Sequence, residues 1–248
     1  MRLTVDIGNT NINLGVFSKG KLLRRLSFPT GANSYALKIR KIFKGYPINN
    51  VIICSVVPQA TRKLKMVLRS YPGSLPVVGR NTRVPIKNLY RNPKQVGSDR
   101  LVNAYAAIKL YGAPAVVVDF GTAVTFDVVS RKGEYLGGMI LPGLRIALEA
   151  LAEKTALLPK TKLSPPKELI GRDSQSSMLS GIIYGMASLT RGLCARIRRQ
   201  VGAKALVIGT GGNIKLMARY CRIFKRVDPD LTLKGLNLLL SEKEGEGQ

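Results

Sequence analysis

Apolar and polar residues along the chain form short strand-like runs, separated by longer segments in which apolar residues recur at helical spacing. In the first half, the runs joined by tight polar turns predict strands, and so does the continuous apolar run before a proline. The predicted strands are Leu3–Asp6, Asn11–Phe17, Lys21–Phe28, Val51–Val57 and Leu75–Val78. The predicted helices are Ser34–Phe43, Pro58–Tyr71 and a third that Ser98 or Asp99 caps and that ends at Tyr111.

The second half repeats the order of the first. Its predicted elements are three strands within Ala115–Leu141, helices over Leu144–Glu153 and Ser174–Val201, and a buried strand at Ala205–Ile208. Two short helices are expected around residues 223–227, and the tail from Ser241 onward is expected to fray. Each half thus has the order β-β-β-α-β-α. This order predicts an α/β fold with helix-covered sheets and two tandem domains, residues 1–112 and 113–248.

The two halves begin with the same kind of turn. Residues 6–10 are Asp-Ile-Gly-Asn-Thr and residues 119–122 are Asp-Phe-Gly-Thr, each after a β-rich apolar run. Glycine lets the backbone approach a ligand, successive N–H groups can cradle phosphate oxygens, and the carboxylate of Asp6 can hold Mg2+ through water. A single turn of this composition is also typical of an ordinary hairpin. The duplication favours two lobes that face each other across a shared site.

A third glycine-rich turn, Gly-Thr-Gly-Gly-Asn at residues 209–213, follows a predicted buried strand and precedes a helix. That context suits a nucleotide, because the N–H groups at a helix start attract anions. The turn is not a P-loop, since no Gly-Lys-Ser/Thr follows, and it does not fit the Gly-x-Gly-x-x-Gly pattern of dinucleotide-binding proteins.

Residues 97–100, Gly-Ser-Asp-Arg, lie at the start of a predicted helix, where the backbone amides and the helix dipole favour an anion. Arg100 can bind a carboxylate with both arms of its guanidinium group, and Asp99 can accept a hydroxyl proton during phosphoryl transfer. A simple helix cap followed by a solvated arginine is the alternative interpretation of the same residues.

The charge is extreme, with 40 Lys and Arg residues against 14 Asp and Glu, a formal net charge of +26. Such a charge is typical of proteins that bind polyanions, and equally of a basic proteome or of a thermophilic or salt-adapted lineage. The cations occur singly and in pairs, without zinc-finger spacing or an aromatic-rich basic strand. Phosphorylated substrates are therefore expected partners, and specific nucleic-acid binding is not.

The chain contains no histidine, which excludes Ser-His catalysis and histidine metal sites and leaves acid–base chemistry to Asp, Glu, Lys, Tyr or Cys. The three cysteines lack metal-type spacing, and Cys54 is expected to be a small core residue. No apolar run is long enough to span a membrane, and the first residues do not have the composition of a signal peptide. A reducing cytoplasm is the expected compartment.

Two Asp-x-Gly turns followed by a late Gly-Gly turn resemble the sugar kinase, Hsp70 and actin superfamily of ATP-binding proteins. Within that superfamily the chain is similar to the type III pantothenate kinases over almost its whole length. The motifs that carry the similarity are those at residues 6–10, 97–100 and 118–123, together with Gly-Gly-x-Ile-x-Pro-Gly at 137–143. The resemblance implies two tandem ribonuclease H-like lobes in an actin-like ATPase fold, with the turns at 6–10 and 119–122 on phosphates and the turn at 209–213 on adenosine.

The resemblance also implies roles for individual residues. Asp99 is the implied proton acceptor, Asp119 the ligand of a monovalent cation, and Asp6 the residue that holds Mg2+ through water. The implied ATP contacts are Asp6, Ile7, Gly8, Asn9, Thr10, Asn11, Ile12, Asn13 and Thr122. The implied pantothenate contacts are Tyr90, Gly97, Ser98, Asp99, Arg100 and Ser174. Ser98 stands where the family usually has alanine, and Ser174 where it commonly has threonine.

The activity implied is ATP-dependent phosphorylation of pantothenate to 4'-phosphopantothenate, the first step of coenzyme A biosynthesis, with Mg2+ and with K+ or NH4+. A homodimer is implied as well, and the glycines at 181, 185 and 192 of the long helix indicate either close packing across a dimer or packing within the subunit. The alternative function is a catalytically silent relative that binds nucleic acid as a regulator. A kinase for another small hydroxy acid is excluded only by the resemblance.

Overall fold

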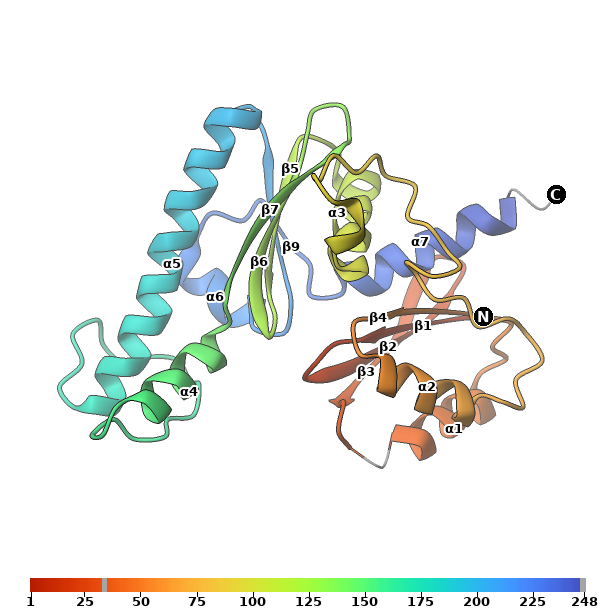
Figure 1. The fold of residues 1–248 in the computed structure, drawn as a ribbon, viewed down its shortest axis with the longest axis horizontal. Coiled ribbons are helices and arrows are strands. Elements are labelled where there is room, and N and C mark those ends of the chain that lie inside the picture. The colour runs from red at the N-terminus through yellow and green to blue at the C-terminus, as the bar shows by residue number, and fades with distance from the viewer. Residues whose placement is uncertain (33–34, 246–248) are drawn as a thin grey trace. The chain divides into compact units, whose positions relative to one another are not determined.

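The three strand runs that open each half form strands in the computed structural model, which describes residues 1–32 and 35–245. The chain forms two compact units (Figure 1). The first consists of Met1–Ile86, Arg91–Ala106 and Leu231–Gln248, and the second of Lys87–Tyr90 and Ala107–Asp230. No helix of the described residues is long and apolar enough to cross a membrane.

The first unit is built on a four-stranded sheet with the order β3-β2-β1-β4. Its strands are β1 (Arg2–Ile7), β2 (Asn11–Ser18), β3 (Lys21–Pro29) and β4 (Asn50–Ser55). Its helices are α1 (Tyr35–Gly45), α2 (Pro58–Val67), the start of α3 (Ser98–Tyr111) and α7 (Leu231–Gly245). Strand β1 is antiparallel to β2 and parallel to β4, so the ends of β1 and β4 lie together at one edge of the sheet.

Side chains of this sheet alternate between two cores, as the twofold period of a strand requires. Leu3, Val5 and Ile7 of β1 pack with residues of α1 and α2. Ile52 and Cys54 of β4 point to the opposite face, where they pack with α3 and α7. Asp6 is the register partner of Cys54 and therefore shares that second face, next to the start of α3.

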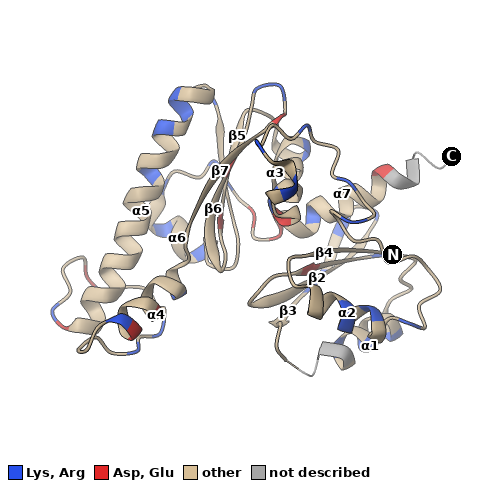
Figure 2. Cartoon of the chain, viewed as in Figure 1, with Lys and Arg blue, Asp and Glu red and all other residues tan. Residues whose placement is uncertain are grey.

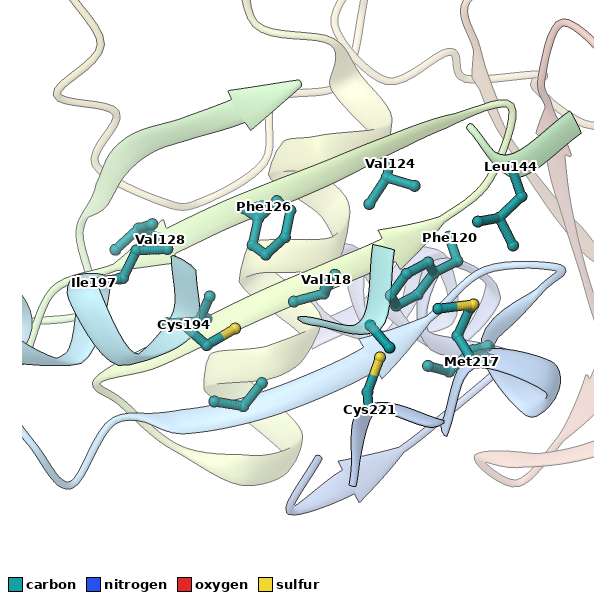
Figure 3. Packing of buried hydrophobic residues seen from close by; sticks show 14 of the residues in the cluster. Val118, Phe120, Val124, Phe126, Val128, Leu144, Cys194, Ile197, Met217 and Cys221 are labelled. Atoms are coloured by element: carbon teal, nitrogen blue, oxygen red, sulfur yellow. The ribbon is translucent and has the colours of Figure 1, made fainter. Parts of the chain in front are cut away.

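The second unit is built on a five-stranded sheet with the order β7-β6-β5-β8-β9. Its strands are β5 (Ala115–Phe120), β6 (Ala123–Val129), β7 (Tyr135–Pro142), β8 (Leu206–Thr210) and β9 (Arg226–Val227). Its helices are α4 (Leu144–Lys154), α5 (Ser174–Val201) and α6 (Ile214–Cys221). Figure 3 shows the apolar face of this sheet, where Val118 and Phe120 of β5 and Phe126 of β6 pack against residues of α5 and α6 such as Cys194 and Met217.

Several expected elements differ from those observed. Residues 75–78 form only isolated bridges, from Val77 to Ile53 and from Val78 to Thr82. Helix α2 ends at Val67 rather than Tyr71, because the next turn tightens into bonds three residues apart, such as Arg69 N–H to the Met66 carbonyl. Ser34, the expected first residue of α1, lies outside the described residues.

The C-terminal helix is longer than expected. Instead of a short helix and a frayed tail, α7 spans fifteen residues, and only residues 246–248 of the expected tail lie outside the described residues. It packs on β1 and β4 of the first unit, with Leu231 and Leu236 fully buried. Gly235 lets it approach α3 closely, since a Cβ atom there would lie 2.8 Å from the Val102 carbonyl oxygen. Arg2 donates hydrogen bonds to Ser241 and Asn237 and so fixes the helix to the start of β1.

Candidate active site

The first turn begins at the end of β1. Gly8 donates its N–H to the Asn11 carbonyl at 2.9 Å, and Thr30 donates its hydroxyl to the Gly8 carbonyl at 2.7 Å. A Cβ atom on Gly8 would lie 3.3 Å from the Asn11 oxygen, so the tightness of this turn favours glycine. Asn13, the cross-strand partner of Asp6, donates a hydrogen bond of 3.3 Å to the Asp6 carboxylate.

The segment 97–100 opens α3. The helix begins at Ser98, so neither Ser98 nor Asp99 is the residue before the helix; instead the Asp99 carboxylate lies in the first turn and accepts the N–H of Arg100 at 2.9 Å. A Cβ atom on Gly97 would lie 2.5 Å from the Asp99 carboxylate, so glycine at position 97 makes room for that carboxylate. The Cys54 thiol donates to the Ser98 hydroxyl at 3.5 Å, which ties this turn to β4. Arg100 is buried, with 8% of its surface exposed, rather than a solvated arginine.

Asp6 and Asp99 influence each other electrostatically. Burial and, to a smaller extent, the nearby Asp99 charge raise the pKa of Asp6 to about 7, against the lowering effect of the Asn13 hydrogen bond. Burial also raises the pKa of Asp99, against the lowering effect of the Arg100 N–H and guanidinium group. Desolvation and these two carboxylates raise the pKa of the Cys54 thiol, so Cys54 is an inert packing residue, as expected.

These two carboxylates stand alone in a basic stretch of sequence. Asp6 and Asp99 are the only acidic residues among the first 118, which include twenty lysines and arginines. Helices α1 and α2 accordingly carry basic residues and no acidic ones (Figure 2). A buried carboxylate that is close to another is unfavourable unless a cation or a proton joins it. A cation or a proton at this pair would relieve that cost.

The second and third turns meet in the second unit. Strands β5 and β8 are parallel, with Asp119 opposite Thr210, so their carboxyl ends lie side by side. Gly211 follows β8 with a φ of 92°, and a Cβ atom there would collide with the Asp119 carboxylate and the Phe120 backbone. Asn213 donates its N–H to the Phe120 carbonyl at 3.1 Å. The fold thus brings the 119–122 turn and the 209–213 turn together.

Close backbone packing also explains the glycine at the end of the 137–143 motif. A Cβ atom on Gly143 would overlap the Thr122 carbonyl, so glycine at 143 lets the start of α4 lie directly against the second turn. On the other side of that turn, Gly121 donates its N–H to the Ala123 carbonyl at 3.1 Å. Thr122 is consequently held on a rigid turn.

Tyr90 and Ser174 lie on other elements of the second unit. Tyr90 is half-buried beside β7, where a Cβ atom on Gly137 would lie 3.2 Å from the tyrosine ring. Ser174 is the exposed first residue of α5, next to Asp173, whose side chain accepts the Ser176 N–H at 2.7 Å as the cap of that helix. No hydrogen bond or ring contact among the described residues joins Ser174 to Tyr90 or to Asp119.

The donor set suits Mg2+ carried by a nucleotide. The described residues contain no cluster of three or more Asp, Glu, Cys or His side chains that could hold a metal by itself. Mg2+ usually keeps several waters and takes one or two carboxylates together with substrate phosphates, so a single carboxylate such as that of Asp6 suits an ion of this kind.

The long helix leaves its glycines open. Cβ atoms at Gly181, Gly185 and Gly192 would meet nothing within 4 Å among the described residues, so none of those residues packs closely against these glycines. All three are exposed and lie on one face of α5, as their spacing of four and seven residues requires.

Sequence reasoning missed one polar cluster in the second unit, formed by Asp127, Tyr135 and Thr125. Asp127 is fully buried and accepts hydrogen bonds from the other two side chains. The sequence contained a signal for this cluster, because an aspartate in the mostly apolar run Val124–Val129 requires internal partners.

Solved structures of low sequence identity share this fold. A conserved putative Baf family transcriptional activator from Campylobacter jejuni matches with a TM-score of 0.59 at 20% identity, over 98% of this chain and 99% of that one. A putative 2-dehydro-3-deoxygalactonokinase from Sinorhizobium meliloti matches with a TM-score of 0.54 at 11% identity, over 98% and 96%. Two sheet-and-helix units with paired Asp-x-Gly turns thus define a protein of the actin-like ATPase and sugar kinase fold, as expected from the sequence.

Similar sequences show to which family within that fold class the chain belongs. The family model described as type III pantothenate kinase matches residues 2–196. The type III pantothenate kinase of Frankia alni is 43% identical over 98% of this chain and 99% of its own length, and that of Moorella thermoacetica is 41% identical over 96% and 98%. The chain belongs to the type III pantothenate kinase family.

Proposed function

We propose that Asp99 accepts the proton of the pantothenate hydroxyl while that oxygen attacks the γ-phosphorus of ATP, with the first unit holding the acceptor alcohol. The activity itself follows from the family: the chain is a kinase that phosphorylates pantothenate with ATP in coenzyme A biosynthesis. In this step the bond from the attacking oxygen to phosphorus forms, the bond from phosphorus to ADP breaks, and the alcohol proton passes to a carboxylate.

The observation that supports this role for Asp99 is that its carboxylate is buried and close enough to Asp6 for its charge to raise the pKa of Asp6. Burial raises the pKa of Asp99, which makes its carboxylate a stronger proton acceptor than an exposed aspartate. Gly97 and the Arg100 N–H fix the orientation of that carboxylate. Among the first 118 residues only Asp6 can share the task, and it lies on the turn whose N–H groups suit phosphate.

The remaining contacts with pantothenate are assigned by chemistry. Arg100, buried at the start of α3, would bind the pantothenate carboxylate with its guanidinium group, and Gly97 and Ser98 would contact the substrate through the same turn. In the second unit, Tyr90 offers a half-buried ring and Ser174 an exposed hydroxyl to the substrate.

The nucleotide contacts follow the glycine turns. In the first unit, residues 6–13, including Ile7, Asn9, Thr10, Asn11, Ile12 and Asn13, form the proposed phosphate turn and its second strand. Asp6 would hold Mg2+ through water, and that ion neutralises phosphate charge when bound. In the second unit, Thr122 on its rigid turn would contact ATP, and the 209–213 turn would hold the adenosine end.

Asp119 is the proposed ligand of a monovalent cation, K+ or NH4+. Its carboxylate lies where Gly121 and Gly211 both approach it closely, which places backbone groups around one charged side chain. Oxygen donors from a carboxylate and neighbouring carbonyls suit a hard cation of this kind.

We further propose a homodimer and a reducing cytoplasm. The exposed glycines of α5 support close approach of a second copy, and the three cysteines are free buried thiols, which suits a reducing compartment. The same proposal includes an N-terminal lobe, residues 1–112, with the first phosphate turn and the substrate helix. It also includes a C-terminal lobe, residues 113–248, with the second phosphate turn and the adenosine turn.

A panel of alcohols tests the substrate. ADP release is measured with Mg2+, K+ and either pantothenate or related hydroxy acids, and pantothenate is expected to give the largest kcat/KM.

The net charge of +26 favours a second candidate, a nucleic-acid-binding regulator. A salt titration separates the two, since binding that ignores sequence and vanishes at physiological salt reflects only the field of a basic protein.

A further inference from the structure

A buried carboxylate lies on the second unit's sheet without a place in the proposed chemistry. Asp127 of β6 is 0% exposed. It accepts the Tyr135 hydroxyl at 2.9 Å through one oxygen and the Thr125 hydroxyl at 3.2 Å through the other. Tyr135 is itself 0% exposed. A phenylalanine would fill that space with no polar group to desolvate, so the hydroxyl and the carboxylate call for a reason beyond packing.

The position of Tyr135 follows from an irregularity in strand pairing. The register between β6 and β7 shifts at Val128 and Val129, so that Tyr135 pairs with Val129 and Gly137 pairs with Val128. Since facing residues share a side of the sheet, this shift puts Tyr135 on the Asp127 side, away from the apolar cluster of α5 and α6. The Tyr135 hydroxyl can therefore reach Asp127, which lies two positions before Val129, the residue that pairs with Tyr135.

Tyr135 in turn holds the segment that carries Tyr90. The Tyr135 carbonyl accepts the N–H of Leu89, and its own N–H donates to the Lys87 carbonyl, both at 2.9 Å. The rings of Tyr90 and Tyr135 lie 6.5 Å apart between centroids, at an interplanar angle of 40°. The Tyr90 ring also lies against Gly137 of β7, where a Cβ atom would come within 3.2 Å of the ring.

We propose that Asp127 and Tyr135 are positioning residues that fix the ring of Tyr90 for pantothenate. The inference rests on the proposed role of Tyr90 as a pantothenate contact. Asp127 holds the Tyr135 hydroxyl, the hydroxyl fixes the tilt of the Tyr135 ring, and that ring sets the surface against which Tyr90 lies. A ring whose orientation is fixed before the substrate arrives loses less entropy on binding, so these residues act on substrate affinity rather than on the phosphoryl transfer.

The experiment compares steady-state kinetics of the full chain and its variants, with pantothenate varied at saturating Mg-ATP and with ATP varied at saturating pantothenate. Tyr135→Phe removes only the hydroxyl and is expected to raise KM for pantothenate about three- to tenfold, the scale of one lost hydrogen bond. The kcat and the KM for ATP are expected to stay within about twofold, because the group acts only on substrate affinity. Asp127→Asn keeps the shape and is expected to change the same constant in the same direction.

Two further variants separate positioning from general destabilisation. Tyr111→Phe removes another tyrosine–aspartate hydrogen bond of the second unit, from Tyr111 to Asp228 at 2.6 Å, and is expected to lower thermal stability without changing KM for pantothenate. In a Tyr90→Ala background, Tyr135→Phe is expected to add no further increase in KM, because residues that act through one another are not additive.

An unchanged KM for pantothenate in Tyr135→Phe would overturn the inference, and so would the same increase in the presence and absence of the Tyr90 ring. If Asp127→Asn does not fold, Tyr135→Phe decides the matter. If the proposed kinase function is wrong, the unaltered protein itself will release no ADP with pantothenate, which distinguishes that outcome from a failure of the positioning role. Turnover that Tyr90→Ala leaves unaffected would remove the premise about Tyr90 and leave the kinase activity standing.

Discussion

The charge of Asp99 raises the pKa of Asp6, although one residue ends a strand and the other opens a helix ninety-three positions later. Parallel pairing of β1 with β4 puts Asp6 opposite Cys54, and Cys54 contacts Ser98 at the start of α3. The same arrangement thus places the proposed ligand of metal-bound phosphate near the proposed proton acceptor.

The Asp6 carboxylate makes the stability of the ligand-free protein depend on pH. Its folded pKa of about 7 lies above the unfolded value, so the folded state holds the proton more tightly and the free energy of unfolding falls as pH rises from about 4 to about 7. Asp6→Asn removes this effect and is expected to stabilise the ligand-free protein by on the order of 2 kcal/mol above pH 7. Urea denaturation of both proteins at pH 5 and pH 8 measures it. A stability difference that is the same at both pH values contradicts the coupling.

Gly97 is expected to be needed for catalysis and not for folding. Its backbone conformation accepts an L side chain, but a Cβ atom would lie 2.5 Å from the Asp99 carboxylate and push it away. Gly97→Ala is therefore expected to lower kcat by about ten- to a hundredfold, the size of effect that a misplaced catalytic group gives. Gly45→Ala is the matched control, because a Cβ atom at Gly45 meets nothing within 4 Å. Equal kcat values for the two variants would count against the role of Asp99.

Asp119 is expected to control the response to monovalent cations. The unaltered protein should release ADP faster in K+ or NH4+ than in Na+ or in a bulky organic cation, because the proposed site prefers a cation of one size. Asp119→Asn removes the charge and should abolish that preference at equal ionic strength. Activity that is independent of the cation in the unaltered protein would remove the proposed site.

The exposed glycine face of α5 is expected to be a subunit interface. Gly185→Leu places a large side chain where close approach of a second helix needs none, so light scattering should detect two chains per particle for the unaltered protein and one for the variant. Gln200→Leu adds the same side chain at an exposed position of α5 about 80° around the helix axis from the centre of that face and should leave the dimer intact. Loss of the dimer in both variants, or in neither, contradicts this interface.

The repeated strand order and the Asp-x-Gly turns could be predicted because they depend on local signals. Alternating apolar residues and turn residues mark β1 to β3 and β5 to β7 directly, and the expected positions of Asp6 and Asp119 at strand ends are confirmed. The start of α3 was expected within one residue, although Asp99 lies inside the first turn and not before it. Cys54 is a buried core residue, as expected.

The features that escaped prediction depend on contacts between distant segments. Helix α7 returns to β1 and β4 because its leucines fill the face that Ile52 and Cys54 leave open, and no local pattern contains that information. Likewise, the pairing of Tyr135 with Asp127 requires a register shift that the sequence of β7 does not mark. Gly211 lies against Asp119 for the same kind of reason, since parallel pairing of β5 with β8 joins residues more than ninety positions apart.

The central claim is that Asp99 accepts the proton of the pantothenate hydroxyl, and Asp99→Asn tests it most directly. The substitution keeps the shape of the side chain and removes the base, so kcat is expected to fall by about 10² to 10⁴. Because burial raises the pKa of Asp99, removing its charge should leave thermal stability equal or higher, which excludes unfolding as the cause of the loss. The measurement is pantothenate-dependent ADP release with Mg2+ and K+, for the unaltered protein and for Asp99→Asn at equal concentration. Turnover of the unaltered protein together with a loss of at least a hundredfold in the variant is the predicted result. Full activity in Asp99→Asn, or no pantothenate-dependent turnover in the unaltered protein, would contradict the account.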